Sequence, residues 1–279
     1  MPVRTVAGVD TYWTRTGNGR RKAVLLHCSL ASSRAWGPLS AVLDTHLDMT
    51  LLDFPGHGKT ADWDETRDYQ DLCTEIAQDF LPEGACDLIG HSFGATVALR
   101  LAHAMPERVR SLTLIEPVFF AAAYADRPDL RVVHDRMLGD FSDALDRGDM
   151  HAAAAHFTAV WGDGRPWEAL PDEMRHKMAA RIHMVPASHA ALNTDRQGML
   201  LPGGLQHVTC PVLLVEGSES PDLMSLINDG LARRLTDARR VVISGAGHMV
   251  PITHAAQVAR EIWALLQETA VATPTRAMD

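Results

Sequence analysis

The chain has 279 residues, of which 46% are hydrophobic and 22% are charged, and its formal net charge is −9. This length and composition are typical of one globular unit, with or without an insertion, that buries a sizeable core. The acidic balance argues against nucleic acid as a main partner, and no apolar stretch approaches the ~20 residues of a membrane span. Four scattered cysteines and no apolar leader indicate a reduced, cytoplasmic protein.

Short apolar runs separated by helix-length segments follow one another along the chain. A strand pair is expected at 4–9 and 11–15, and buried strands at 23–27, 49–52, 86–89, 112–115, 212–215 and 241–243. Helices are expected between most of them, at 69–80, 95–104, 223–235 and 253–266. This alternation predicts an α/β fold with a mostly parallel, doubly wound sheet that is covered on both faces.

The alternation of strands and helices stops in the interval 121–204, which contains no convincing strand. Helical patterning predominates there, with helices expected at 140–145, 151–160 and 171–184. We expect a helical cap at 121–204, lying over the carboxyl edge of a core formed by residues 1–120 and 205–268, where open α/β sheets bind ligands. Residues 269–279 are expected to be a frayed tail.

Within the strand–helix junction at 86–104 lies Gly90-His91-Ser92-Phe93-Gly94, a G-x-S-x-G pattern. A serine on such a turn is forced outward, and small residues on either side allow the backbone to bend sharply. Ser92 is therefore the expected nucleophile. A serine hydroxyl needs a positioned base, which in turn needs an orienting carboxylate.

The base is expected late in the chain, on a loop at the same edge of the sheet. His248 meets this requirement, because Gly245-Ala246-Gly247-His248 follows the last expected strand and precedes a helix. An oxyanion hole needs two N–H donors. We expect one from Phe93 and one from Ser29 on the loop after the first parallel strand, with Leu30 as an alternative for the second.

These motifs together resemble those of the α/β-hydrolase fold superfamily, in the form that carries a helical cap. The matching segments span nearly the whole chain: His27-Cys28-Ser29, Asp53-Phe54-Pro55-Gly56-His57-Gly58, Gly90–Gly94 and Gly245–His248. Relatives usually have glycine where this chain has Cys28, so a side chain is expected to narrow the oxyanion loop.

The resemblance also implies where the acid commonly lies, namely on the loop after the strand that follows the cap. The corresponding position is Ser220, which cannot supply a carboxylate. Glu116 ends the strand after the nucleophile helix, a place where some families of the superfamily carry the acid. We expect Glu116 to be the acid of the triad, with Asp222 and Glu219 as alternatives.

The expected activity is that of a serine hydrolase, which cleaves a small or medium carboxylic ester, thioester or lactone through an acyl-enzyme on Ser92. A small molecule is the expected partner, and no metal or organic cofactor is implied. Carbon–carbon bond hydrolysis, cofactor-free perhydrolysis and a non-catalytic ligand-binding role remain alternatives. Aromatic residues expected to shape the pocket are Phe119, Phe120, Trp161 and Trp167.

Overall fold

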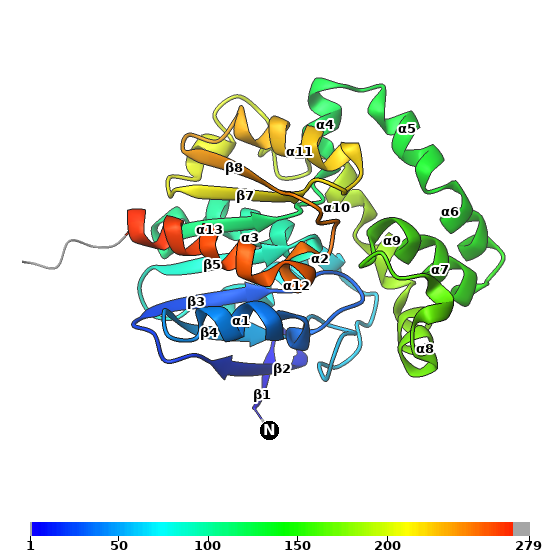
Figure 1. Cartoon of the computed structure of the whole chain (residues 1–279), viewed down its shortest axis with the longest axis horizontal. Helices are drawn as coiled ribbons and strands as arrows, with labels where there is room; N and C mark the ends of the chain where they lie inside the picture. Colours follow the sequence, from blue (N-terminus) through cyan, green and yellow to red (C-terminus); the bar gives the residue numbers. More distant parts are fainter. Residues whose placement is uncertain (1, 270–279) are drawn as a thin grey trace, which may run out of the picture.

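A single eight-stranded sheet forms the centre of the computed structural model, which describes residues 2–269 (Figure 1). Its spatial order is β1-β2-β4-β3-β5-β6-β7-β8. The strands are β1 (Val3–Val6), β2 (Val9–Thr16), β3 (Arg21–Leu26), β4 (Leu47–Leu52), β5 (Cys86–His91), β6 (Val109–Ile115), β7 (Val212–Gly217) and β8 (Ala238–Ile243). The expected α/β class with a mostly parallel, doubly wound sheet is confirmed.

One strand of the sheet, β2, runs against the direction of all the others. Strands β3 to β8 run parallel, whereas β2 pairs antiparallel with both β1 and β4. The expected first strand at 4–9 is wrong at its end, because the chain turns at Ala7 and Gly8, with φ values of 51° and 84°. Val9 therefore pairs with Val6 across the hairpin rather than continuing the same strand.

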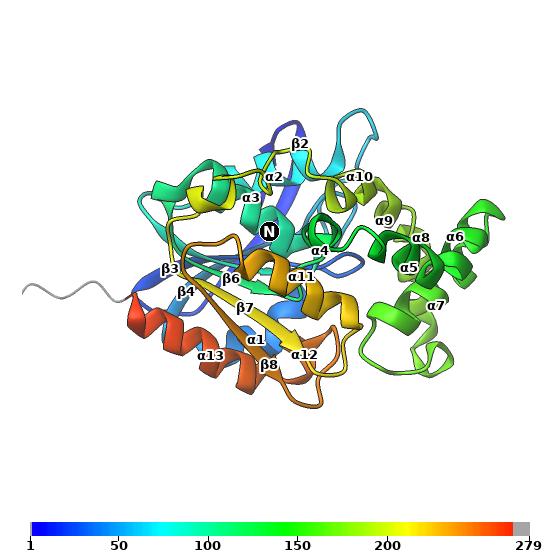
Figure 2. The same cartoon turned by 90° about the horizontal axis from the view of Figure 1, so that it is seen from above.

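Helices cover both faces of the sheet (Figure 2). One face carries α1 (Gly37–Leu43), α12 (Val250–Thr253) and α13 (Ala255–Glu268), and the other carries α2 (Tyr69–Asp79), α3 (Phe93–Ala104), α4 (Phe120–Asp126) and α11 (Asp222–Ala232). The parallel strands are apolar on both faces because helices bury both. Short 3-10 turns occur at Ser33–Trp36, Pro106–Arg108, Trp167–Ala169 and Leu205–His207.

The segment between β6 and β7 contains helices joined by turns and loops, and no strand. After α4 it forms α5 (Leu130–Met137), α6 (Gly139–Asp146), α7 (Met150–Trp161), α8 (Asp172–Arg181), α9 (Met184–Ala187) and α10 (His189–Asn193). Helices α5 to α9 project beyond the carboxyl ends of the strands in Figure 1. The division at residues 121 and 204 stays a prediction, since α4 packs against α11 of the core.

The helical segment has a small core of its own and also contacts the main core. Phe141, Ala153 and Ile182 pack together within it. Trp161 and Met184 belong instead to the large cluster that covers the sheet. The helices are thus held over the carboxyl edge of the sheet by buried apolar contacts as well as by chain connectivity.

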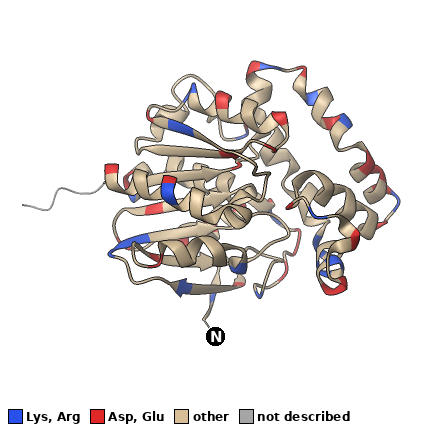
Figure 3. Cartoon of the chain, in the orientation of Figure 1, with Lys and Arg blue, Asp and Glu red and all other residues tan. Residues whose placement is uncertain are grey.

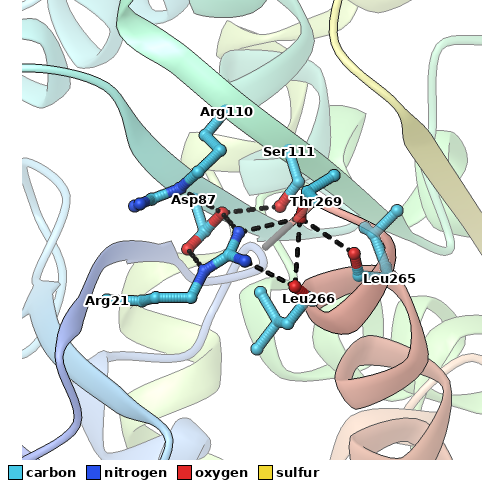
Figure 4. Close-up of polar contacts among 7 residues, drawn as sticks. All are labelled: Arg21, Asp87, Arg110, Ser111, Leu265, Leu266 and Thr269. Carbon is cyan, nitrogen blue, oxygen red and sulfur yellow. Dashed lines mark hydrogen bonds and ion pairs between the residues drawn. The ribbon is translucent and has the colours of Figure 1, made fainter. Parts of the chain in front are cut away.

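A buried carboxylate organises the opposite edge of the sheet (Figure 4). Asp87 accepts hydrogen bonds from Arg21, Arg110 and Ser111, and its own side chain is 1% exposed. Arg21 also donates to the hydroxyl of Thr269, just after α13. Thr269 is therefore held, and the remaining residues of the expected frayed tail, 270–279, lie outside the described part of the chain.

No helix in the range 2–269 combines the length and the apolarity that crossing a bilayer requires.

Candidate active site

Ser92 occupies the turn between β5 and α3. Its backbone is left-handed, with φ 54° and ψ −118°, and its N–H donates to Ile115 O at 2.9 Å. A Cβ at Gly90 would lie 2.5 Å from Ala95 Cα, and one at Gly94 would lie 2.1 Å from Leu26 O. Only glycine fits at either position, so the two glycines let the strand, the turn and the helix approach as closely as they do.

His248 lies on the loop between β8 and α12, with its ring between two other polar side chains. Its Nε2 is 2.9 Å from Ser92 Oγ, and its Nδ1 is 2.9 Å from Glu116 Oε2. Because a carboxylate only accepts, Nδ1 carries the proton and Nε2 is free to accept the serine hydroxyl. All three side chains are buried, Glu116 completely. The structure thus brings Ser92, His248 and Glu116 into one hydrogen-bonded row.

Glu116 comes directly after β6 and makes two further contacts. Its Oε1 accepts hydrogen bonds from Gly217 N–H at 2.6 Å and from Ser220 Oγ at 2.8 Å. The alternatives Glu219 and Asp222 are both exposed, and within residues 2–269 neither side chain forms a hydrogen bond or ion pair with His248. The hydroxyl at the usual acid position therefore donates to a carboxylate that comes from the neighbouring strand.

His91 holds the loop that carries His248, a role that the sequence did not indicate. Its Nε2 donates to the carbonyl oxygen of His248 over 2.8 Å. Burial lowers the pKa of His91 to about 3, so the ring stays neutral near pH 7. The ring of Trp161 from α7 approaches His248 edge-on, with 4.9 Å between ring centroids. Backbone and ring of His248 are thus fixed from separate sides.

The two residues expected as alternatives for an oxyanion-hole donor, Ser29 and Leu30 on the loop after β3, differ in the contacts of their N–H groups. Leu30, with φ 61°, donates its N–H to His57 Nε2 at 3.0 Å, so that donor is already engaged. Within residues 2–269, the N–H groups of Ser29 and Phe93 have no hydrogen-bond partner. Phe93 is the first residue of α3, where helix N–H groups are unpaired. These two donors remain available to a ligand.

Two buried histidines, His27 and His57, hydrogen-bond to backbone groups in and around this loop. His27 Nε2 accepts from Phe54 N–H at 2.9 Å, and burial lowers the pKa of His27 to about 4 and that of His57 to about 3. Burial raises the pKa of the Cys28 thiol to about 12, so Cys28 stays protonated. Both histidines that contact this loop are therefore neutral near pH 7.

A cavity of about 430 Å³ lies between Ser92 and the helical segment. Ser29 and Ser92 form part of its floor, and Phe120 and Trp161 line it as expected from the sequence. Phe119 instead lies in the main core, and Trp167 packs against His151, so neither lines the cavity. A cavity of this size holds a small or medium organic molecule.

The described lining of the cavity contains acidic residues but no lysine or arginine. Asp135 and Asp146 are exposed at its border, and Figure 3 marks further acidic residues along α6. No group of three His, Cys, Asp or Glu side chains among residues 2–269 is arranged to hold a metal ion. The cavity favours neutral over anionic ligands, because no cationic side chain there offsets the desolvation of an anion.

Residues 23–261 match the model of the alpha/beta hydrolase family. The chain is 29% identical over 240 residues to a pimeloyl-[acyl-carrier protein] methyl ester esterase of Nitrosomonas europaea, covering 84% of this chain and 90% of the relative. It is 22% identical to the (E)-2-((N-methylformamido)methylene)succinate hydrolase of Acinetobacter baylyi, over 88% of this chain and 90% of the relative. An enol-lactonase from Burkholderia xenovorans has the same fold, with a TM-score of 0.71, 19% identity and coverage of 95% and 100%.

Proposed function

The chain belongs to the alpha/beta hydrolase family and is a hydrolase, and we propose that it cleaves a small or medium carboxylic ester, thioester or lactone through an acyl-enzyme on Ser92. The observation that carries this proposal is the hydrogen-bonded row Ser92–His248–Glu116, whose serine lies in the wall of a cavity. A hydroxyl, an imidazole and a carboxylate in this order are the parts that acyl transfer through serine requires.

In the first half of the proposed reaction, Ser92 Oγ attacks the carbonyl carbon while its proton passes to His248 Nε2. Glu116 holds the imidazole in the productive tautomer and stabilises the imidazolium that forms. The N–H groups of Ser29 and Phe93 receive the developing oxyanion. Collapse of the tetrahedral intermediate breaks the bond to the leaving group, which takes the proton from Nε2.

In the second half, water attacks the acyl carbon and gives its proton to His248 Nε2. The bond to Ser92 Oγ breaks, the proton returns to this oxygen, and the carboxylic acid leaves. No cofactor enters either half. Trp161 and Phe120, together with Phe141 and Phe157, line the cavity in which the acyl group would lie.

The alternative of a non-catalytic binding module rested on the serine at the usual acid position. It loses that support because Glu116 supplies a carboxylate 2.9 Å from His248. Carbon–carbon bond hydrolysis and perhydrolysis use similar side chains, and no contact in this site favours either over ester cleavage.

Labelling with a fluorophosphonate probe tests the proposal directly. The folded protein is expected to form a single adduct, found on Ser92 by peptide mass spectrometry, and Ser92→Ala is expected to form none. A panel of 4-nitrophenyl esters with two to twelve acyl carbons should be hydrolysed, with kcat lowered about 10³-fold or more in Ser92→Ala. Folded protein that gains no adduct on Ser92 would contradict the proposal.

A further inference from the structure

The turn after β4, residues 53–60, lies against the oxyanion loop, residues 27–33, and takes no part in the triad row. Three hydrogen bonds join turn and loop: Phe54 N–H donates to His27 Nε2 at 2.9 Å, Leu30 N–H to His57 Nε2 at 3.0 Å, and Ser33 N–H to Asp53 Oδ1 at 2.6 Å. The turn therefore holds the loop at its beginning, its middle and its end.

The ring of His57 is fixed as an acceptor toward this loop. Its Nδ1 lies 2.9 Å from the carbonyl oxygen of Pro55, which can only accept, so Nδ1 carries the proton. Nε2 then presents its lone pair to Leu30 N–H. The ring is 2% exposed, and burial lowers its pKa to about 3, so the imidazolium that would turn Nε2 into a donor is absent near pH 7.

Leu30 has a backbone conformation that needs such support. Its φ of 61° lies in the left-handed region, which residues with a Cβ rarely adopt and which persists only where the surroundings enforce it. The side chain of Leu30 packs against the small core of the helical segment. Its N–H is held by His57 from the other side. Leu30 is thus kept in this conformation by one apolar and one polar contact.

The two peptide groups that flank Ser29 are each held by one histidine. Because His27 Nε2 accepts from the turn, His27 Nδ1 carries the proton and donates to Cys28 O at 2.7 Å. In a trans peptide the C=O and the N–H point in opposite directions, so Ser29 N–H points away from Cys28 O. The next peptide carries Leu30 N–H, which His57 holds. Ser29 lies between these two fixed groups and lines the cavity beside Ser92.

We propose that His57 is a positioning residue of the reaction: by accepting the N–H of Leu30, it keeps the N–H of Ser29 aimed at the developing oxyanion. This inference rests on the proposed function and adds a residue that does not touch the substrate. Without the acceptor, Leu30 N–H loses its partner and the left-handed backbone loses a support, so the peptide between Ser29 and Leu30 turns. The loss falls on the transition state, because the carbonyl oxygen gains its charge only there.

Two substitutions that differ by one methylene test the role of His57. In His57→Gln the amide oxygen reaches the place of Nε2 and can accept from Leu30 N–H, whereas in His57→Asn the amide ends near the place of Nδ1. We expect His57→Asn to lower kcat on the best 4-nitrophenyl ester by about 10- to 100-fold with little change in KM, and His57→Gln to stay within about threefold of wild type. Wild-type kcat in His57→Asn would overturn the proposal.

A thionoester separates loss of oxyanion binding from a general loss of order. In it, sulfur replaces the carbonyl oxygen, and sulfur is a weak hydrogen-bond acceptor. The ratio of kcat/KM for the ester to that for its thionoester therefore measures how well the N–H donors are aimed. This ratio is expected to fall about 10-fold in His57→Asn and to persist in His57→Gln. If His57→Asn keeps the wild-type ratio, His57 has only a structural role and the proposal is wrong.

Thr60→Val is the matched control on the same turn. The Thr60 hydroxyl donates to Asp53 O at 2.7 Å and accepts from Tyr12 N–H at 2.9 Å, so it joins the turn to β2 and not to the oxyanion loop. The variant should be less stable in urea and keep the wild-type ratio of ester to thionoester. A fall as large as that in His57→Asn would assign the effect to the whole turn and overturn the role of His57.

Replacing Leu30 with its α-hydroxy acid keeps the test falsifiable if the His57 variants fail to fold. This change, made by nonsense suppression, substitutes an ester for the peptide and removes the N–H while His57 stays intact. The ratio of ester to thionoester is expected to fall as in His57→Asn. An unchanged ratio would overturn the proposal.

Amide hydrogen exchange separates failure of this inference from failure of the proposed function, because it requires no turnover. Leu30 N–H is expected to exchange at least about 10-fold faster in His57→Asn than in the wild type. Equal exchange in the two proteins would overturn the inference, even where Ser92 forms its adduct and esters are hydrolysed. Faster exchange in His57→Asn, in a protein that forms no adduct on Ser92, would support the contact with Leu30 and refute the acyl-enzyme.

Discussion

Glu116 combines the contacts that make it the strongest acid candidate of the site. One carboxylate oxygen faces His248, while the other accepts from Gly217 and Ser220. Glu116→Gln is expected to lower kcat by about 10³- to 10⁴-fold, because an amide can donate to Nδ1 and stabilise the wrong tautomer. Steady-state kinetics on the best 4-nitrophenyl ester would measure this loss.

The matched control is Asp222→Asn, which changes an exposed carboxylate at the start of α11. We expect its kcat to stay within twofold of wild type. The assignment of the acid would be wrong if Asp222→Asn abolished turnover and Glu116→Gln retained it.

Ser220 stands at the usual acid position and donates to Glu116 at 2.8 Å. Ser220→Ala should lower kcat by about 3- to 10-fold with little change in KM, because one hydrogen bond that orients the carboxylate is lost. Ser220→Thr keeps the hydroxyl and should restore most of the rate. Equal kcat values for all three proteins would show that Gly217 N–H and His248 alone orient Glu116.

The juxtaposition of Ser92, His248 and Glu116 could be anticipated from the sequence, because each follows a strand and parallel strands end at one edge. Their catalytic roles remain proposals. The contacts of His91, Ser220 and His134 could not be foreseen, since each depends on atoms far away in the chain. No local pattern distinguishes these residues from an ordinary surface histidine or serine.

Among the elements, α5 shows why the helical segment was only partly predictable. Its sequence places valines at 132 and 133, yet both are largely exposed, at 61% and 58%. Leu130 and His134 are the buried pair of this helix. These two buried positions lie four residues apart, and one of them is a polar histidine. The sequence therefore shows no apolar helix face here, and the helix was not expected. The central strands and α3 were foreseen because most of their residues are apolar and buried.

Helix α13 depends on the polar cluster of Figure 4 at the edge opposite Ser92. Asp87→Ala should lower the free energy of unfolding by about 3–5 kcal/mol, because Arg21 and its neighbours lose a buried acceptor. Urea denaturation would measure the loss. The kcat of the folded variant should match the wild type, since the cluster is remote from the cavity.

Asp48→Ala is the control for this prediction, because Asp48 pairs with Arg15, whose side chain is 60% exposed. It should cause no measurable loss of stability. Equal losses in the two variants would contradict the role given to Asp87.

For the whole molecule, neutral buried histidines predict a loss of stability in acid. Burial lowers the pKa of His27 and His134 to about 4 and of His57 and His91 to about 3, from 6.5 in the unfolded chain. The unfolded chain therefore binds more protons in this range. Stability is fully present above about pH 6.5 and falls toward pH 4, by up to about 1.4 kcal/mol per pH unit for each histidine.

Urea denaturation at pH 7.5, 6.5, 5.5 and 4.5 would measure this dependence. The midpoint should change little between the two higher values and drop steeply between the two lower ones. A midpoint that stays constant from pH 7 to pH 5 would contradict the prediction that these rings are neutral in the folded protein.

Ser92 and Glu116 share a backbone feature with φ values of 54° and 51°. Outside glycine such a conformation costs about 1–3 kcal/mol and persists only where the surroundings enforce it. Glycine at either position would relax the chain and erase the row of hydrogen bonds. Selection of variants for heat resistance alone should therefore favour glycine at these two positions. Stability and activity would then be in conflict first at the two residues on which the proposed chemistry depends.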